Sequence, residues 1–277
     1  MSDLSVRHLQ PGSKGYVLPA ASLVISFAWM MLSNSLANSL PLNGYSTGAV
    51  SALYPNRFVP AGFTFSIWGV IYILLTGWLV MALMVLKRNH HEEFIWRHVR
   101  STRPLFVWSC VLNGAWIFAW HYLQLFLSVL IMLLLLLVLI RMYSKMQTYQ
   151  SALTGFSRIW LYQSMIVYMA WISVATIANI TALLVGWQWT PQSTEESYWS
   201  IGMISVAFLL GILIGYKRKE PAFLIVLAWA FYGIGKGQEA QSMVVRNSAL
   251  IAATLSVIFT IGAWLKKSRS EVIDGVL

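Results

Sequence analysis

The sequence predicts an all-α integral membrane protein with eight transmembrane helices, and its composition and apolar patterning carry that prediction. Of its 277 residues, 58% are hydrophobic and only 10% are charged, whereas soluble domains carry roughly 25% charged residues. The mean hydropathy is +0.67. A helix needs about 20 mostly apolar residues to cross the hydrocarbon core of a bilayer. The chain therefore has room for several crossings and short loops, but not for a sizeable soluble domain as well.

Apolar runs that are broken by charged residues define the candidate spans. Their approximate bounds are 17–38, 63–86, 104–122, 124–142, 159–186, 198–216, 221–235 and 246–265. A very short turn joins the third span to the fourth, and the seventh span is short. We expect the first span to be a retained helix rather than a cleaved signal peptide, because its apolar stretch is longer than most signal sequences contain.

The distribution of basic residues predicts the orientation of these spans. With eight spans, 16 of the 19 Lys and Arg residues fall on one side, and Arg57, Lys236 and Arg246 fall on the other. Basic residues are enriched in cytoplasmic loops, so we expect a protein of the cell membrane with both termini in the cytoplasm. The formal net charge of +10 is then a topology signal, and no nucleic-acid partner is expected.

The acidic residues and histidines argue against ion coupling and metal binding. All nine Asp and Glu residues fall in tails, loops or span ends, whereas carboxylates inside the membrane are typical of proton relays and cation-coupled transporters. The histidines His90, His91 and His98 lie close to Glu92 and Glu93. We interpret this cluster as a solvated amphipathic segment rather than a metal site.

Four predicted helices each carry a stripe of aromatic or amide side chains at the helical repeat. The stripes are Asn34 and Asn38; Phe65, Trp68 and Tyr72; Ser109, Asn113, Trp116 and Trp120; and Tyr168, Trp171, Ala175 and Asn179. Buried amides should face other helices or a cavity, because an unpaired amide in hydrocarbon is costly. Two interpretations stay open: ordinary packing between helices, or a slot for a planar, mostly apolar ligand. For tryptophans outside the stripes, such as Trp78, we expect ordinary packing between helices or a place at the membrane interface.

The connection at 39–62 is long for a transmembrane hairpin. Loops of this length are usually functional or disordered, and the apolar and aromatic residues in this one argue against disorder. We therefore expect it to fold over the outer mouth of the bundle and to gate access. Its one charged residue, Arg57, is expected to meet solvent or lipid headgroups, with an acidic group on a ligand as the alternative.

Three segments together resemble the tryptophan-rich sensory proteins, the TspO/MBR family of translocator-protein relatives. They read PAGFTFSIWGVIYILLTG at 60–77, LNGAWIFAWH at 112–121 and YMAWISVATIANI at 168–180. The family pattern has a PPG-aromatic opening of the second helix that continues as W-x-x-x-Y. Its third helix carries N-x-x-W, and its fifth reads P-Y-x-x-W-x-x-x-A-T-x-x-N. The resemblance covers about residues 17–187.

The residues that match these motifs are the candidate ligand-binding residues. They are Pro60 and Gly62 in the turn, Trp68 and Tyr72 in the second helix, Asn113 and Trp116 in the third, and Tyr168, Trp171, Ala175 and Asn179 in the fifth. Two positions depart from the pattern, because Ala61 and Val167 stand where the family has prolines. The floor of the pocket is therefore expected to differ in shape.

The resemblance implies a five-helix membrane domain at 17–187. The remaining three apolar runs lie outside the family pattern, so we expect a three-helix membrane extension with a cytoplasmic tail at 188–277. The resemblance also implies a sensor or regulator that binds a tetrapyrrole or another flat lipophilic molecule and needs no cofactor or metal. The expected partners are membrane lipid, the hydrophobic ligand and, as in many family members, a second copy of the chain. Two alternatives stay open: a facilitator or exporter of small lipophilic molecules, and a porphyrin-degrading enzyme, although a non-enzymatic role is favoured.

Overall fold

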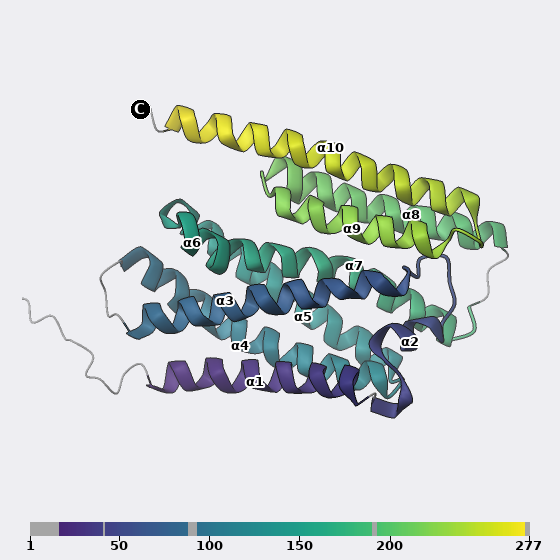
Figure 1. Cartoon of the computed structure of the whole chain (residues 1–277), viewed down its shortest axis with the longest axis horizontal. Helices are drawn as coiled ribbons and strands as arrows, with labels where there is room; N and C mark the ends of the chain where they lie inside the picture. The colour runs from purple at the N-terminus through teal and green to yellow at the C-terminus, as the bar shows by residue number, and fades with distance from the viewer. Residues whose placement is uncertain (1–16, 41, 88–92, 190–192, 275–277) are drawn as a thin grey trace, which may run out of the picture.

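The structure is a computed structural model that describes residues 17–40, 42–87, 93–189 and 193–274. Within these ranges all regular structure is helical and no strand is present. Long helices lie side by side along one axis, and α8, α9 and α10 form a layer along one flank of the others (Figure 1). The predicted all-α architecture is therefore confirmed.

The first part of the chain forms a bundle of long helices. Its elements are α1 (Val17–Ser39), α3 (Ile67–Lys87), α4 (Glu93–His121), α5 (Leu125–Gln147), η3 (Gln150–Ala152), α6 (Gly155–Arg158), η4 (Ile159–Gln163) and α7 (Ser164–Gly186). Helix α4 packs against both α1 and α5, and α5 also packs against α7. The turn between α4 and α5 is as short as predicted, and Leu123 completes it with φ 57°.

The remaining elements are a segment over one end of the bundle and the C-terminal helices. The segment between α1 and α3 holds η1 (Leu42–Gly44), α2 (Thr47–Ala52) and η2 (Gly62–Ser66), and we call residues 42–66 the cap segment. The Ser46 side chain caps α2 by accepting from the backbone N–H of Ala49. The C-terminal elements are α8 (Ser193–Gly211), η5 (Ile212–Lys217), α9 (Pro221–Gly237) and α10 (Met243–Asp274).

Six helical stretches in the described ranges are long and apolar enough to cross a bilayer. They correspond to the first, second, fourth, fifth, sixth and eighth predicted spans. The other two predicted spans are also helices, but they are not among these six. The continuous helix α4 contains polar residues such as Asn113, and α9 has only 17 residues. The chain is thus a multi-pass membrane protein, and six of the eight predicted spans coincide with helices that are long and apolar enough to cross the bilayer.

The first and last described residues of the chain lie at the same end of the helix bundle. Successive long helices alternate in direction, so that α1 begins and α10 ends at one end, and α2 lies at the other (Figure 1). This arrangement agrees with an even number of crossings. Arg7, Lys14 and Arg88, which contribute to the predicted charge asymmetry, lie outside the described residues.

Trp78 packs between helices, which is one of the two places expected for tryptophans outside the stripes. Its side chain is fully buried and stacks on Phe106 of α4, with ring centroids 3.9 Å apart. The residue therefore belongs to the packed interior, where stacked aromatic rings add to the stability gained by burial.

His98 corrects one expectation from the sequence. It lies in α4 and is fully buried, with Nε2 3.3 Å from the carbonyl oxygen of Leu161. The prediction of a solvated segment is therefore wrong at this position, because the helix turns this residue toward η4. His90, His91 and Glu92 lie outside the described residues.

Close packing joins the C-terminal helices to one another and to the first bundle. A Cβ atom on Gly211 or Gly215 would lie 2.5 Å or 2.3 Å from the side chains of Leu227 and Leu224. These glycines therefore let the end of α8 and η5 approach α9, as expected for small residues at helix interfaces. On its other side, α9 packs against α7 and η2, which brings the C-terminal layer to the edge of the cap segment.

Candidate functional site

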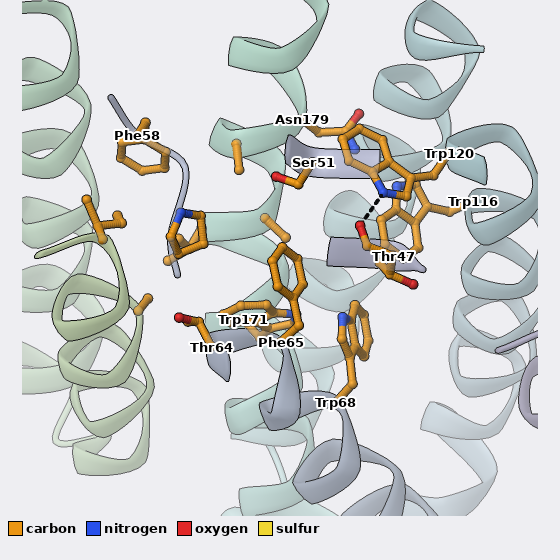
Figure 2. A pocket seen from close by; sticks show the side chains of 16 residues that line it. Thr47, Ser51, Phe58, Thr64, Phe65, Trp68, Trp116, Trp120, Trp171 and Asn179 are labelled. Carbon is orange, nitrogen blue, oxygen red and sulfur yellow. Dashed lines mark hydrogen bonds between the residues drawn. The ribbon is translucent and has the colours of Figure 1, made fainter. Parts of the chain in front are cut away.

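A cavity lies under the cap segment, and five parts of the chain line it. The cap segment contributes Thr47, Ser51 and Phe58 among others, α3 and α4 contribute tryptophans, and α7 and α9 supply mostly small apolar residues. Figure 2 shows these side chains converging on one space. The volume of the cavity is about 40 Å³, far below the roughly 300–1,000 Å³ of typical ligand pockets.

Indole rings form the aromatic wall. The ring of Trp68 from α3 stacks on Trp116 of α4 with centroids 5.7 Å apart, and meets Trp171 of α7 edge to face at 6.2 Å. Trp116 in turn stacks on Trp120 at 6.2 Å. All four rings line the cavity (Figure 2). They offer broad apolar faces, which suit the faces of a flat ligand.

The wall formed by α7 combines the aromatic ring of Trp171 with small residues. Ala175 and Ala178 line the cavity one and two turns beyond this ring, and Asn179 lies at the far end. The Asn179 Oδ1 atom accepts a hydrogen bond from Ser128 Oγ of α5 at 3.0 Å. The short alanine side chains leave the space that larger residues would fill.

The C-terminal helix α9 provides the remaining wall and holds the cap segment. Ala230 and Ile234 line the cavity. The backbone N–H of Ala61 donates to the carbonyl oxygen of Gly233 at 2.9 Å, and Trp229 Nε1 donates to the carbonyl oxygen of Thr64 at 3.0 Å. The predicted C-terminal extension thus takes part in the site, because α9 forms one of its walls.

Arg57 joins the cap segment to α8, which corrects the expectation that it meets solvent or headgroups. Its backbone N–H donates to Glu196 Oε1 at 3.0 Å, and its Nε atom donates to Glu196 Oε2 at 3.2 Å. The terminal guanidinium nitrogen Nη1 of Arg57 also donates to Ser197 Oγ. The charge of Arg57 is therefore matched within the protein.

The structure divides the ten predicted site residues into two groups. Six of them line the cavity, namely Pro60, Trp68, Trp116, Trp171, Ala175 and Asn179. The other four lie nearby but do not line it, namely Gly62, Tyr72, Asn113 and Tyr168. Of these, Gly62 begins η2, and Tyr72 stacks against the far side of the aromatic wall, 5.6 Å from Trp68.

A chain of buried hydrogen bonds accounts for two of the residues outside the lining. Asn34 Nδ2 of α1 donates to Asn113 Oδ1 of α4 at 2.8 Å, and Asn113 Nδ2 donates to the hydroxyl oxygen of Tyr168 in α7 at 2.9 Å. Asn113 and Tyr168 are fully buried. These polar groups hold three helices together behind the aromatic wall, as interhelical hydrogen bonds do in membranes.

Several lining residues escaped prediction, for different reasons. Trp120 belongs to a stripe recognised in the sequence, and that signal could have placed it in the site. Ala230 and Ile234 carry no comparable signal, because small and aliphatic residues are common in every apolar helix. Phe58 lies in the cap segment, which was predicted to cover the site, but no pattern within the segment singled this residue out.

Polar atoms at the cavity are few, and several have no partner. Among the described residues, Trp116 Nε1, Trp171 Nε1 and Thr64 Oγ1 are buried and make no hydrogen bond. Trp120 Nε1, by contrast, donates to the carbonyl oxygen of Thr47 at 3.1 Å (Figure 2). None of the described lining residues is charged. The site is therefore an apolar space with unused hydrogen-bond donors.

Comparison with protein-family models matches the TSPO-like protein family over residues 20–262. The matched region includes the site and continues through α8, α9 and most of α10, beyond the segments that carry the motif resemblance. Comparisons with curated proteins and with solved structures give no significant match. Because the family match covers most of the chain and includes every wall of the cavity, this protein belongs to the TSPO-like family.

Proposed function

We propose that this protein is a membrane sensor or regulator that binds a flat lipophilic molecule in the cavity under the cap segment. The observation that carries the proposal is the wall of four indole rings, Trp68, Trp116, Trp120 and Trp171, around one apolar space. A tetrapyrrole is the ligand that the family resemblance implies. Apolar burial would drive binding with about 25 cal/mol per Å², before the cost of ordering the ligand and the cap segment is subtracted.

Binding of a ring compound in this cavity requires the cap segment to move. The present volume of about 40 Å³ is too small even for the benzene-sized ligand that fits a roughly 150 Å³ cavity. The cap segment is the part of the wall made of short helices and turns, and loops of this kind open more easily than packed helices. In this proposal, the cap segment opens to admit the ligand and closes over it.

We also propose that α4 and α9 cross the membrane, which gives eight spans with both termini in the cytoplasm of the cell. At 1.5 Å per residue, α4 is about 44 Å long and α9 about 26 Å, against a hydrocarbon core of about 30 Å. The test uses single cysteines in a Cys110→Ser background. In intact cells, an impermeant maleimide should label Tyr122→Cys and Glu239→Cys but not Lys217→Cys. Labelling of Lys217→Cys would contradict the topology.

Titration of the purified full chain with the uncharged dimethyl ester of protoporphyrin, followed by tryptophan fluorescence, tests the proposed function. We expect saturable quenching in the wild type, and loss of saturation in Ala175→Phe, whose ring would fill the cavity. Val70→Phe is the matched control, because Val70 is an exposed residue of α3 that faces away from the cavity. Equal, non-saturating signals in all three proteins would overturn the proposal.

The same preparation distinguishes the two alternatives. Time-dependent loss of bound porphyrin that Trp171→Phe abolishes would indicate the degrading enzyme. Counterflow of ligand in vesicles would indicate the facilitator or exporter. Light scattering of the detergent-solubilised protein tests the predicted homodimer, which would have twice the protein mass of the 31.3 kDa chain.

A further inference from the structure

We propose that the ligand of this cavity is an uncharged ring compound with carbonyl-type acceptor atoms, and that Trp116 and Trp171 donate hydrogen bonds to them. This inference rests on the proposed function and narrows its ligand class. Three observations carry it: two unused donors, the arrangement of the rings around them, and the lack of charge in the lining.

The donors are the N–H groups of Trp116 and Trp171. The two side chains are only 4% and 3% exposed, and their Nε1 atoms have no hydrogen-bond partner among the described residues. Among the other indoles, Trp29, Trp120 and Trp229 donate to backbone carbonyl oxygens. Trp78 and Trp199, which do not line the cavity, are also unpaired. A buried donor without an acceptor has lost its bonds to water. A ligand atom that accepts at this position recovers that loss.

The rings define where such a ligand would lie. Trp68 stacks on Trp116 and meets Trp171 edge to face, so the two donors belong to rings that both contact Trp68. Phe65 of the cap segment closes the same space and meets Trp171 edge to face at 6.3 Å. A flat molecule between these rings would have its faces against apolar surfaces and its edges available to the two N–H groups.

The charge of the lining excludes ionised ligands from the interior. None of the described lining residues is charged, and the cation of the cap segment, Arg57, is already paired with Glu196. A carboxylate taken into this space would lose its hydration without gaining a counter-charge, which is strongly unfavourable. Neutral acceptors such as ketone or quinone oxygens need only the N–H groups that are present.

Three related probes test the ligand class directly: anthracene, 9,10-anthraquinone and anthraquinone-2-carboxylate. They share the same three fused rings and differ in carbonyl oxygens and charge. We would measure binding to the purified full chain by equilibrium dialysis, with protein-free micelles as the background. We expect anthraquinone to bind about tenfold more tightly than anthracene, as one or two hydrogen bonds would give. The carboxylate should bind at least about tenfold more weakly than anthraquinone.

Conservative variants connect this preference to the two donors. Trp116→Phe and Trp171→Phe keep an aromatic ring but remove the N–H group, so each should reduce the preference for anthraquinone over anthracene by about threefold. A matched control should keep the preference. Trp78→Phe removes an unpaired N–H from a residue outside the cavity.

The outcomes separate this inference from the function on which it rests. Equal affinity for anthraquinone and anthracene in the wild type would overturn the inference, while saturable binding of both would leave the proposed function standing. A preference that survives in both Trp116→Phe and Trp171→Phe would also overturn it. If none of the probes binds saturably, this inference fails, and the proposed function fails with it only if the porphyrin titration is also non-saturating. Because the probe comparison uses the wild-type chain, it gives an answer even if a variant does not fold.

Discussion

One carboxylate, that of Glu196 at the start of α8, holds both the backbone and the side chain of Arg57 in the cap segment. The backbone N–H of Arg57 lies 3.0 Å from Oε1, and its side-chain Nε atom lies 3.2 Å from Oε2. The two side chains are 18% and 26% exposed, so water screens this pair less than a surface ion pair. A residue outside the first five predicted spans thus fixes the position of the segment that covers the cavity.

Replacement of Glu196 by alanine should loosen the cap segment. The variant loses the two charge-assisted hydrogen bonds from Arg57 to Glu196. Such bonds contribute about 1.5–3 kcal/mol each, and partial exposure of the pair reduces this contribution. We expect faster hydrogen exchange in residues 53–60, and faster association and dissociation of ligand. Mass spectrometry and stopped-flow fluorescence measure these rates.

The control for this variant breaks an ion pair that does not hold the cap segment. Lys236 pairs with Glu239 near the end of α9, and both side chains are well exposed. Lys236→Gln should leave exchange in residues 53–60 unchanged. If Glu196→Ala exchanges no faster than Lys236→Gln in this segment, the ion pair does not anchor the cap.

Ala61 offers a second way to release the cap segment, through a single backbone atom. Its N–H donates to Gly233 of α9 at 2.9 Å, a bond that the proline of the family pattern could not form. The φ angle of Ala61 is −58°, which suits proline, so Ala61→Pro removes the donor without distorting the backbone torsion. We expect a loss of about 1–3 kcal/mol in stability and faster ligand exchange, measured by thermal unfolding and stopped-flow fluorescence.

Ala61→Ser is the matched variant, because serine keeps the backbone N–H. It should retain the thermal stability and the exchange rates of the wild type. If Ala61→Pro also retains both, the bond to Gly233 contributes nothing to closure. This departure from the family pattern would then have no structural consequence.

The helical repeat predicted which residues share a face, but not which partners that face meets. It placed Trp68, Trp116 and Trp171 on stripes, and the structure brings their rings together. Asn113 belongs to the same stripe as Trp116, yet it faces α1 and α7 behind the aromatic wall. A turn of helix spans 5.4 Å along its axis, so residues of one stripe can contact different neighbours.

Contacts between distant parts of the chain set the limit of prediction from this sequence. The apolar runs predicted the helices, and the composition of 39–62 predicted a folded cover. The pairing of Arg57 with Glu196 joins residues that are 139 positions apart, and no local pattern contains that information. The contribution of Ala230 to the cavity is equally hidden, because its position depends on how α9 packs against α7.

Asn113 should be important for stability rather than for ligand contact. It is fully buried, accepts from Asn34 and donates to Tyr168. Asn113→Leu would leave the Asn34 amide with only the carbonyl oxygen of Met30 as an acceptor, so that one buried N–H has no partner, at a cost of about 1–3 kcal/mol. We expect a lower unfolding temperature but the same discrimination between anthraquinone and anthracene. Trp116→Phe should show the opposite pattern, with weaker discrimination between the two probes but the same unfolding temperature. An Asn113→Leu protein with wild-type stability would contradict the structural role of Asn113.

His98 predicts a specific dependence of stability on pH. It lies before the 104–122 span, and burial lowers its pKa to about 4, from an ordinary value of about 6.5. The folded protein therefore favours neutral His98, and the unfolded chain binds the proton more readily. Its contribution to stability is complete above pH 6.5 and declines as the pH falls from 6.5 toward 4, by about 1.4 kcal/mol per pH unit at most.

Thermal unfolding of the wild type and of His98→Gln between pH 7.5 and 4 tests this dependence. Glutamine does not titrate and keeps an N–H group that can donate to the carbonyl oxygen of Leu161, which lies 3.3 Å from His98 Nε2. We expect the unfolding temperature of the wild type to fall more steeply below about pH 6.5 than that of the variant. Other buried groups such as His121 titrate in both proteins, so the difference between the two curves isolates His98. Parallel curves over this range would show that proton binding at His98 is not linked to folding.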